Sequence, residues 1–342
     1  MIELADTPVL RDPVMIAAFE GWNDAGEAAT AVLEHLSRVW GAEPFAALDP
    51  EEYYDFQVNR PSVGIDDEDH RRITWPTTRL LAAHVPAIGR DVVIVDGIEP
   101  SMRWRSYTIE LLECAERLGV TTLVTVGALL ADVPHTRPIP VTATSEDPSM
   151  RGRLGVEQSR YEGPTGIVGV LAGAAAQADL PGASLWAAVP HYAGGGPSPK
   201  ATLALLRRIE ELLDITIPLA DLPDLAQAWE RGVDELAESD SEVGDYVRAL
   251  EEAKDTTELP EATGEAIALE FERYLRRRDD EPPPPRPRWL APAGPPPPPP
   301  APPPPDPPPP PHCLHQVPPR PRAARQLVQQ VRDLGGQTRT PS

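Results

Sequence analysis

Short apolar runs alternate with amphipathic helical patterns along most of this chain, and this alternation restricts its fold more than any other feature. Residues 14–19 read VMIAAF, a run typical of a buried strand. Asp24 then precedes apolar side chains at a 3.6-residue period, which predicts a helix capped by that aspartate. The succession recurs, with strands predicted at 92–95, 122–126 and 184–189 and helices at 106–118, 166–178 and 199–213. Repeats of this kind predict an α/β fold with a mostly parallel sheet and right-handed crossovers.

Two further segments complete the predicted organisation. The segment 44–73 is richer in Tyr, Phe, Val and Asp and is expected to add strands or a hairpin at one sheet edge. After Pro218 helical patterns dominate, at 222–236, 242–253 and 262–278. We therefore predict a core domain over 1–217 and a helical appendage over 218–281. The helix at 166–178 is rich in small residues and is expected to pack its backbone close against the sheet.

The composition changes abruptly after Glu281. Residues 282–342 contain 25 of the 45 prolines. Proline holds φ near −65° and donates no backbone hydrogen bond, so this proline-rich tail is expected to be polyproline II or disordered, outside the fold. The tail contains no Glu, Lys, Ile, Phe, Tyr, Met or Asn, which favours a frameshift artefact, a GC-rich coding region read out of frame. The alternative is a genuine ligand for proline-recognising domains.

Charge and cysteine content restrict the partners and the compartment. The tail has seven Arg against two Asp, so the −22 of the whole chain leaves −27 on residues 1–281. Such a surface repels phosphate backbones and anionic lipid, so binding to nucleic acid or to a membrane is not expected. Cys114 and Cys313 cannot form a disulfide framework. Without a signal-peptide pattern or an apolar stretch of roughly 18 residues, we expect a cytoplasmic protein.

Polar residues that follow the predicted strands are the candidate site. In open α/β sheets ligands bind beyond the carboxyl ends of the strands, so we expect these side chains to converge on one cleft. The candidate ligand- or partner-binding residues are Glu20, Asn23, Asp24, Glu99, His135, Thr136, Arg137, His191 and Lys200.

Two readings of these residues stay open. Two Val-Pro-His triplets, ending at His135 and His191, could form an acid–base cleft with Glu20, Asp24 and Glu99. The alternative is that the same groups stop strands, cap helices and support turns, as the position of Asp24 indicates.

No motif assigns a catalytic residue. Gly194–Gly196 and Lys200 precede or open a helix and could hold an anion, but the spacing is not that of a P-loop, and a flexible loop is the preferred interpretation. The chain has neither a Gly-x-Ser-x-Gly elbow nor a His-x-x-x-His pair. We therefore expect no metal and no cofactor.

Five segments of the chain form a recognisable combination: FEGWNDAG at 19–26, YYDFQVNRP at 53–61, VPHTRP at 133–138, WAAVPHY at 186–192 and EFERYL at 270–275. Together they resemble the proteasome assembly chaperone 2 family, in its actinobacterial branch. The resemblance covers about residues 1 to 280 and depends on the combination of segments. It implies an α/β/α sandwich similar to the nucleoside phosphorylase and hydrolase fold, with a helical C-terminal part.

The resemblance also implies a function. Eukaryotic relatives assist assembly of the proteasome α-ring as a heterodimer, so we expect a protein-binding assembly chaperone or adaptor, with proteasome subunits as candidate partners. The alternative is a small-molecule hydrolase- or ligase-like enzyme that uses the strand-end loops. The docking signal of eukaryotic and archaeal members, a hydrophobic residue followed by Tyr and any residue at the C-terminus, is absent from the ending RTPS.

We also expect a homo-oligomer. The resemblance implies one, and Trp22, Tyr53, Tyr54 and Trp104 fall in predicted loops or edge segments, where a monomer would have to hide them.

Overall fold

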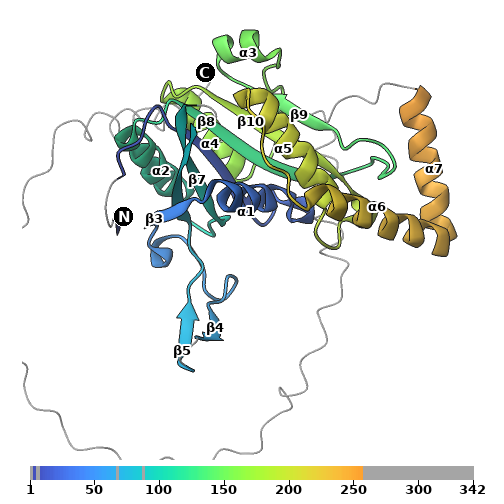
Figure 1. The fold of residues 1–342 in the computed structure, drawn as a ribbon, viewed down its shortest axis with the longest axis horizontal. Helices are drawn as coiled ribbons and strands as arrows, with labels where there is room; N and C mark the ends of the chain where they lie inside the picture. Colours follow the sequence, from blue (N-terminus) through green and yellow to red (C-terminus); the bar gives the residue numbers. More distant parts are fainter. Residues whose placement is uncertain (1–2, 5–7, 67–68, 87–88, 257–342) are drawn as a thin grey trace, which may run out of the picture. The chain divides into compact units, whose positions relative to one another are not determined.

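An eight-stranded sheet forms the centre of this computed structural model, which describes residues 3–4, 8–66, 69–86 and 89–256 (Figure 1). The strands lie in the order β1-β3-β6-β7-β2-β8-β10-β9. Their bounds are Glu3–Leu4 (β1), Val14–Glu20 (β2), Glu43–Ala47 (β3), Arg79–Val85 (β6), Arg90–Ile98 (β7), Thr122–Ala131 (β8), Val141–Thr144 (β9) and Gly182–Pro190 (β10).

The centre of the sheet is parallel and its outer strands are antiparallel. β7, β2, β8 and β10 pair in parallel, in agreement with the prediction of a mostly parallel sheet. β6, β3 and β1 continue the sheet on one side in antiparallel pairs, and β9 pairs antiparallel with β10 on the other. Every residue of β2 except Glu20 is buried, as expected of a strand covered on both faces.

Two layers of helices cover the sheet, so the α/β/α sandwich is confirmed. Successive residues of β2 alternate between two apolar cores, with Ile16 in one and Met15 in the other. The first core includes side chains of α1 (Ala28–Trp40) and α5 (Pro199–Leu213), and the second those of α2 (Trp104–Leu118) and α4 (Ile167–Gln177). The remaining helices are α3 (Pro148–Leu154), α6 (Leu222–Ser239), α7 (Ser241–Thr256) and the short turns η1 (Ala25–Glu27), η2 (Pro50–Glu52) and η4 (His191–Ala193).

The small residues of α4 do not all face the core. Ile167, Val168 and Leu171 are the fully buried side chains of this helix, whereas Gly169 and Gly173 line a cavity. Burying the larger side chains removes more apolar area from water, which explains why this face turns toward the core.

Two of the aromatic residues that suggested an oligomer are inside the single chain, so this part of the expectation was wrong. Tyr53 and Tyr54 are buried. The Tyr54 hydroxyl lies 2.8 Å from Thr78 Oγ1, which in turn lies 2.6 Å from the Tyr107 hydroxyl. The Tyr53 ring meets the Tyr107 ring edge to face. A tertiary polar network therefore accommodates side chains that a sequence pattern alone places at the surface.

The segment 44–73 forms β3 at the sheet edge and also a separate hairpin. β4 (Ser62–Ile65) and β5 (Arg71–Thr74) make a two-stranded antiparallel sheet of their own, the β4–β5 arm (Figure 1). All eight of its strand residues are exposed. The pairing of Val63 with Ile73 and of Ile65 with Arg71 places three apolar side chains on one face. The predicted hairpin exists, but it stands apart from the main sheet.

The first two predicted helices of the appendage are present as α6 and α7. Leu222 and Ala226 of α6 belong to the apolar core that contains α5. The third predicted helix, at 262–278, and the proline-rich tail, 282–342, lie outside the described residues. The division at residue 217 stays a prediction. Among the described helices, none is long and apolar enough to cross a membrane.

Candidate functional site

Asp24 supports the start of α1, although the residue at the N-cap position is Glu27 and not the predicted Asp24. Its carboxylate accepts hydrogen bonds from the backbone N–H of Ala29 at 2.7 Å and of Thr30 at 3.2 Å, and from the Thr30 hydroxyl. The side chain is buried, and burial raises the pKa of this carboxyl although the hydrogen bonds act in the opposite direction. Helix α1 begins at Ala28, after the short turn η1. The Asp24 carboxylate therefore accepts hydrogen bonds from backbone N–H groups of the first helical turn, which have no partner within the helix.

Glu99 joins three segments of the chain. Its Oε1 accepts from Asn23 Nδ2 at 2.7 Å and from the backbone N–H of Ile167, the first residue of α4, at 2.9 Å. A Cβ at Gly166 would lie 2.3 Å from Asn23 Oδ1, so the close approach of α4 to Asn23 requires glycine there. The neighbouring Glu20 accepts the Glu99 backbone N–H through its carbonyl at 2.9 Å, and burial with the charge of Asp96 raises its side-chain pKa.

His135 lies deep beneath the appendage, with 0% of its surface exposed. The Tyr192 hydroxyl is 2.7 Å from the His135 backbone nitrogen and 2.8 Å from Nδ1. Burial raises the pKa of Tyr192 to about 12, so its hydroxyl stays protonated, accepts the backbone N–H and donates to Nδ1. Nε2 then carries the ring proton and donates to Asp234 of α6 across 3.0 Å. Both ring nitrogens of this side chain are therefore engaged within the described chain.

Lys200 and His191 extend the same arrangement. The Lys200 ammonium donates to the His135 carbonyl and to Glu230 of α6, the latter at 2.9 Å. The His191 ring packs edge to face against Tyr192 and Tyr246. Its Nδ1 is 3.2 Å from Asp132 Oδ1, close enough for an ion pair when the imidazole is protonated but misaligned for a hydrogen bond.

Thr136 and Arg137 hold α7. The Arg137 guanidinium donates to Glu251 at 3.1 Å and to Asp255 at 2.8 Å, and the Thr136 hydroxyl also donates to Glu251. The contacts of Asp255 and Glu251 raise the pKa of Arg137, which stays charged. Together these bonds fix the helix against the loop that follows β8.

The nine predicted residues thus form two groups by their contacts. Glu20, Asn23, Asp24 and Glu99 organise the starts of α1 and α4. His135, Thr136, Arg137, His191 and Lys200 lie among groups that include α6 and α7. His135 and His191 do come together, since both rings meet Tyr192, with centroids 5.7 and 5.8 Å away. Whether any of these residues binds a ligand stays a prediction.

The partners of the second group could not be found from the sequence. Glu230, Asp234, Glu251 and Asp255 are acidic residues in amphipathic helices, where such residues usually face water. Only the docking of α6 and α7 on the strand ends brings them to Lys200, His135 and Arg137. Among the described residues, no group of three or more His, Cys, Asp or Glu is placed to hold a metal ion.

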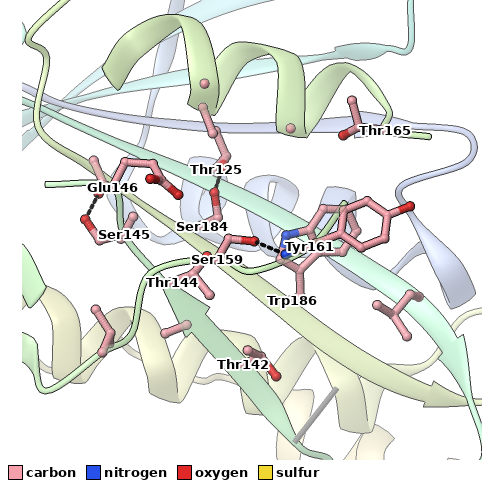
Figure 2. A pocket seen from close by; sticks show the side chains of 18 of the residues that line it. Thr125, Thr142, Thr144, Ser145, Glu146, Ser159, Tyr161, Thr165, Ser184 and Trp186 are labelled. Carbon is pink, nitrogen blue, oxygen red and sulfur yellow. Dashed lines mark hydrogen bonds between the residues drawn. The ribbon is translucent and has the colours of Figure 1, made fainter. Parts of the chain in front are cut away.

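A large cavity lies at the β9 side of the sheet (Figure 2). Its volume is about 2030 Å³. Its lining comes from β8, β9, β10, α4 and the connection between β9 and α4, and also from the loop after β2, from Gly194–Gly196 and from Arg208 of α5. Of the nine predicted residues only Asp24 lines it. In β10, Ser184 and Trp186 alternate with the aliphatic residues Leu185 and Ala187. This alternation is visible in the sequence, but it does not by itself predict a cavity.

These features define an α/β/α protein whose strand ends are covered by C-terminal helices. The model of the PAC2 family matches residues 18–237, and the chain belongs to this family. The expected family resemblance is therefore confirmed.

Solved structures agree with this assignment. A PAC2 family protein from Streptomyces avermitilis is 58% identical over 69% of this chain and 100% of its own, with a TM-score of 0.66. A proteasome-assembly chaperone homologue from Mycobacterium tuberculosis is 49% identical over 68% of this chain and 99% of its own, with a TM-score of 0.63. PbaB of Pyrococcus furiosus, an archaeal proteasome activator, shares the fold at 20% identity over 69% of this chain and 98% of its own, with a TM-score of 0.56. No curated protein matches the sequence.

Replacing Tyr192 with phenylalanine tests the hydrogen bonds between the Tyr192 hydroxyl and His135. Tyr192→Phe removes the acceptor of a buried backbone N–H, so we expect the free energy of unfolding to fall by about 1–3 kcal/mol. Tyr246→Phe is the matched control because its hydroxyl donates to Asp132 in an exposed setting, and its effect should stay within about 0.5 kcal/mol. Urea unfolding measures both. Equal losses for the two variants would contradict this account.

Replacing Asp24 with asparagine tests the pKa shift. Asparagine keeps an oxygen for the N–H groups of Ala29 and Thr30 but carries no charge. The folded-state pKa of Asp24 is raised above its ordinary 3.8, so the folded state binds a proton more tightly than the unfolded state. The free energy of unfolding of the wild type, relative to that of Asp24→Asn, should therefore be highest at a pH below 3.8 and should fall as the pH rises from 3.8 through the folded-state pKa.

Asp147→Asn provides the control with opposite sign. Asp147 caps α3, and hydrogen bonds from the Ser149 hydroxyl and the Met150 N–H lower its pKa. Its wild type should therefore gain stability relative to its asparagine variant as the pH rises. Urea unfolding from pH 3 to 7 measures both differences, and the same slope for both pairs would refute the assignment.

Proposed function

We propose that this protein is a protein-binding assembly chaperone or adaptor whose partners are proteasome subunits. The observation that carries the proposal is the 49% identity to a proteasome-assembly chaperone homologue over 99% of that chain. The contacts of the predicted site support it, since His135, Arg137 and Lys200 join helices to strand ends. An enzyme would instead need such groups free to meet a substrate. The cytoplasm is the compartment that suits these partners.

We also propose that the protein is a homo-oligomer and that the β4–β5 arm contributes to its interface. Ile65 is 73% exposed and Val58 is 74% exposed, and Val63, Ile73 and Trp75 are exposed as well. An isolated two-stranded hairpin is marginally stable in water, so an arm of this kind gains from packing against another surface. A second copy of this chain carries the same apolar face, so two copies can pack these faces against each other.

Binding to proteasome α-subunits tests the proposed function. The purified full-length chain is mixed with separately purified α-subunits from its own host and analysed by size-exclusion chromatography. We expect a complex at micromolar concentration, with serum albumin as the negative control. If the components elute separately at every ratio, the proposed function is wrong.

Two serine substitutions in the arm test the oligomer. Ile65→Ser combined with Ile73→Ser removes the apolar face, and light scattering should then report the mass of a single chain, with the secondary structure retained because neither side chain is buried in the single chain. Arg72→Ser lies on the opposite face of the same hairpin and should leave the wild-type mass unchanged. A single-chain mass for the wild type would remove the proposal.

A further inference from the structure

The cavity at β9 is larger than a pocket for a small molecule. Its volume of about 2030 Å³ is at least twice the roughly 300–1,000 Å³ that encloses a typical small ligand. Its lining includes Thr142 and Thr144 from one face of β9, Val141 and Ala143 from the other, and Arg208 of α5. The space therefore reaches around the edge of β9, and its size fits a stretch of polypeptide.

One wall of the cavity is a sheet face that carries hydroxyl groups. Leu185 and Ala187 of β10 point into the core with α5, so Ser184 and Trp186 point the other way. The register places Thr144 beside Ser184 and Thr142 beside Trp186, and Thr125 Oγ1 is 2.7 Å from Ser184 Oγ (Figure 2). A sealed core would have to satisfy each hydroxyl internally, whereas this face can bond to water or to a polar ligand.

Trp186 gives the same wall an aromatic surface. A Cβ on Gly127 of the neighbouring strand would lie 2.7 Å from the Trp186 ring, so the absence of a side chain there lets the ring lie against β8. Trp186 is half-buried and lines the cavity, as does Tyr161. Aromatic faces attract cationic side chains.

The outer edge of β9 offers unpaired backbone N–H groups at Val141 and Ala143. The N–H of Ala188 donates to the carbonyl of Pro140, which in this antiparallel register directs the backbone groups of Thr142 and Thr144 toward β10. Those of Val141 and Ala143 point away. Within the described chain, neither N–H on that side has a backbone partner. The next outward N–H, that of Ser145, donates to the carbonyl of Glu157 at 3.0 Å, so this edge already accepts an extended segment at one end.

The charge of the lining selects the ligand. Seven carboxylates and two guanidinium groups line the cavity. The carboxylates are Asp24, Glu27, Glu146, Asp147, Glu157, Glu162 and Asp179, and the guanidinium groups are those of Arg160 and Arg208. This excess of negative charge attracts a basic segment.

We propose that the β9 cavity binds an extended basic segment of a partner protein. The segment adds a strand to the free edge of β9, and its basic side chains alternate toward the hydroxyl groups and Trp186. The opposite side chains of the segment face Arg208, where apolar residues fit better than basic ones. The inference rests on the proposed function, because it names the chemistry of the partner that such a chaperone would hold.

A labelled peptide tests the ligand class. The probe is a fluorescein-labelled octapeptide of alternating valine and lysine, added to the full-length protein and followed by fluorescence anisotropy. We expect it to bind at least about tenfold more tightly than a valine–glutamate octapeptide, a difference of about 1.4 kcal/mol. The affinity for the valine–lysine peptide should fall as salt is added, because salt screens the attraction between its lysines and the carboxylates that line the cavity. Equal affinity for the two peptides would overturn the inference.

Ala143→Pro tests the pairing with the strand edge. Proline removes an N–H that points away from β10, a position that edge strands tolerate, so the melting temperature should be retained. Binding of the valine–lysine peptide should weaken at least about tenfold, which corresponds to about 1.4 kcal/mol. An N-methylated version of the peptide, which lacks strand donors, should bind equally weakly to the wild type. Unchanged binding in both cases would overturn the strand addition.

A charge variant gives a second test that does not touch the backbone. Glu157→Gln with Glu162→Gln should weaken the valine–lysine peptide and flatten its salt dependence, whereas Glu51→Gln with Glu116→Gln, away from the cavity lining, should change neither. Failure of the peptide to bind overturns the inference, even when a complex with α-subunits forms. The complex with α-subunits tests only the proposed function, and peptide binding tests only the inference, so a failure of one can be told from a failure of the other.

Discussion

Burial of the central strands on both faces is the constraint from which the rest of the structure follows. Alternate residues of β2 belong to two different apolar cores, so neither face can be left to water. Helices must cover both sides, and the polar groups of the chain are then confined to the strand ends, the sheet edges and the outer helix faces.

At the strand ends, polar side chains mainly hold elements together. Glu99 binds the start of α4, Asp24 binds the start of α1, and His135 is held between Tyr192 and Asp234 of α6. Each of these bonds satisfies a donor or acceptor that would be costly to bury alone. These side chains therefore mainly form contacts between helices and strand ends, which agrees with a protein that works by binding.

The sheet edges and the β4–β5 arm carry the surfaces that are not used internally. The arm exposes apolar side chains on one face, whereas the lining of the β9 cavity mixes apolar, hydroxyl and aromatic side chains and carries an excess of carboxylates. These different chemistries suit different occupants, an apolar face of a second copy for the arm and a basic extended segment for the cavity.

The sequence pattern did not reveal β6, β9 or α3. It predicted the α/β class, the four parallel strands and the helices that became α1, α2, α4 and α5, because periodicity depends on neighbours along the chain. It also predicted a hairpin within 44–73 and the two helices that became α6 and α7. It could not place Tyr53 and Tyr54 inside, since their partners Thr78 and Tyr107 are distant in the chain. Nor could it pair His135 with Asp234, 99 residues away, or form the cavity at β9. These features depend on the tertiary structure, because strand order and helix docking determine which distant side chains meet.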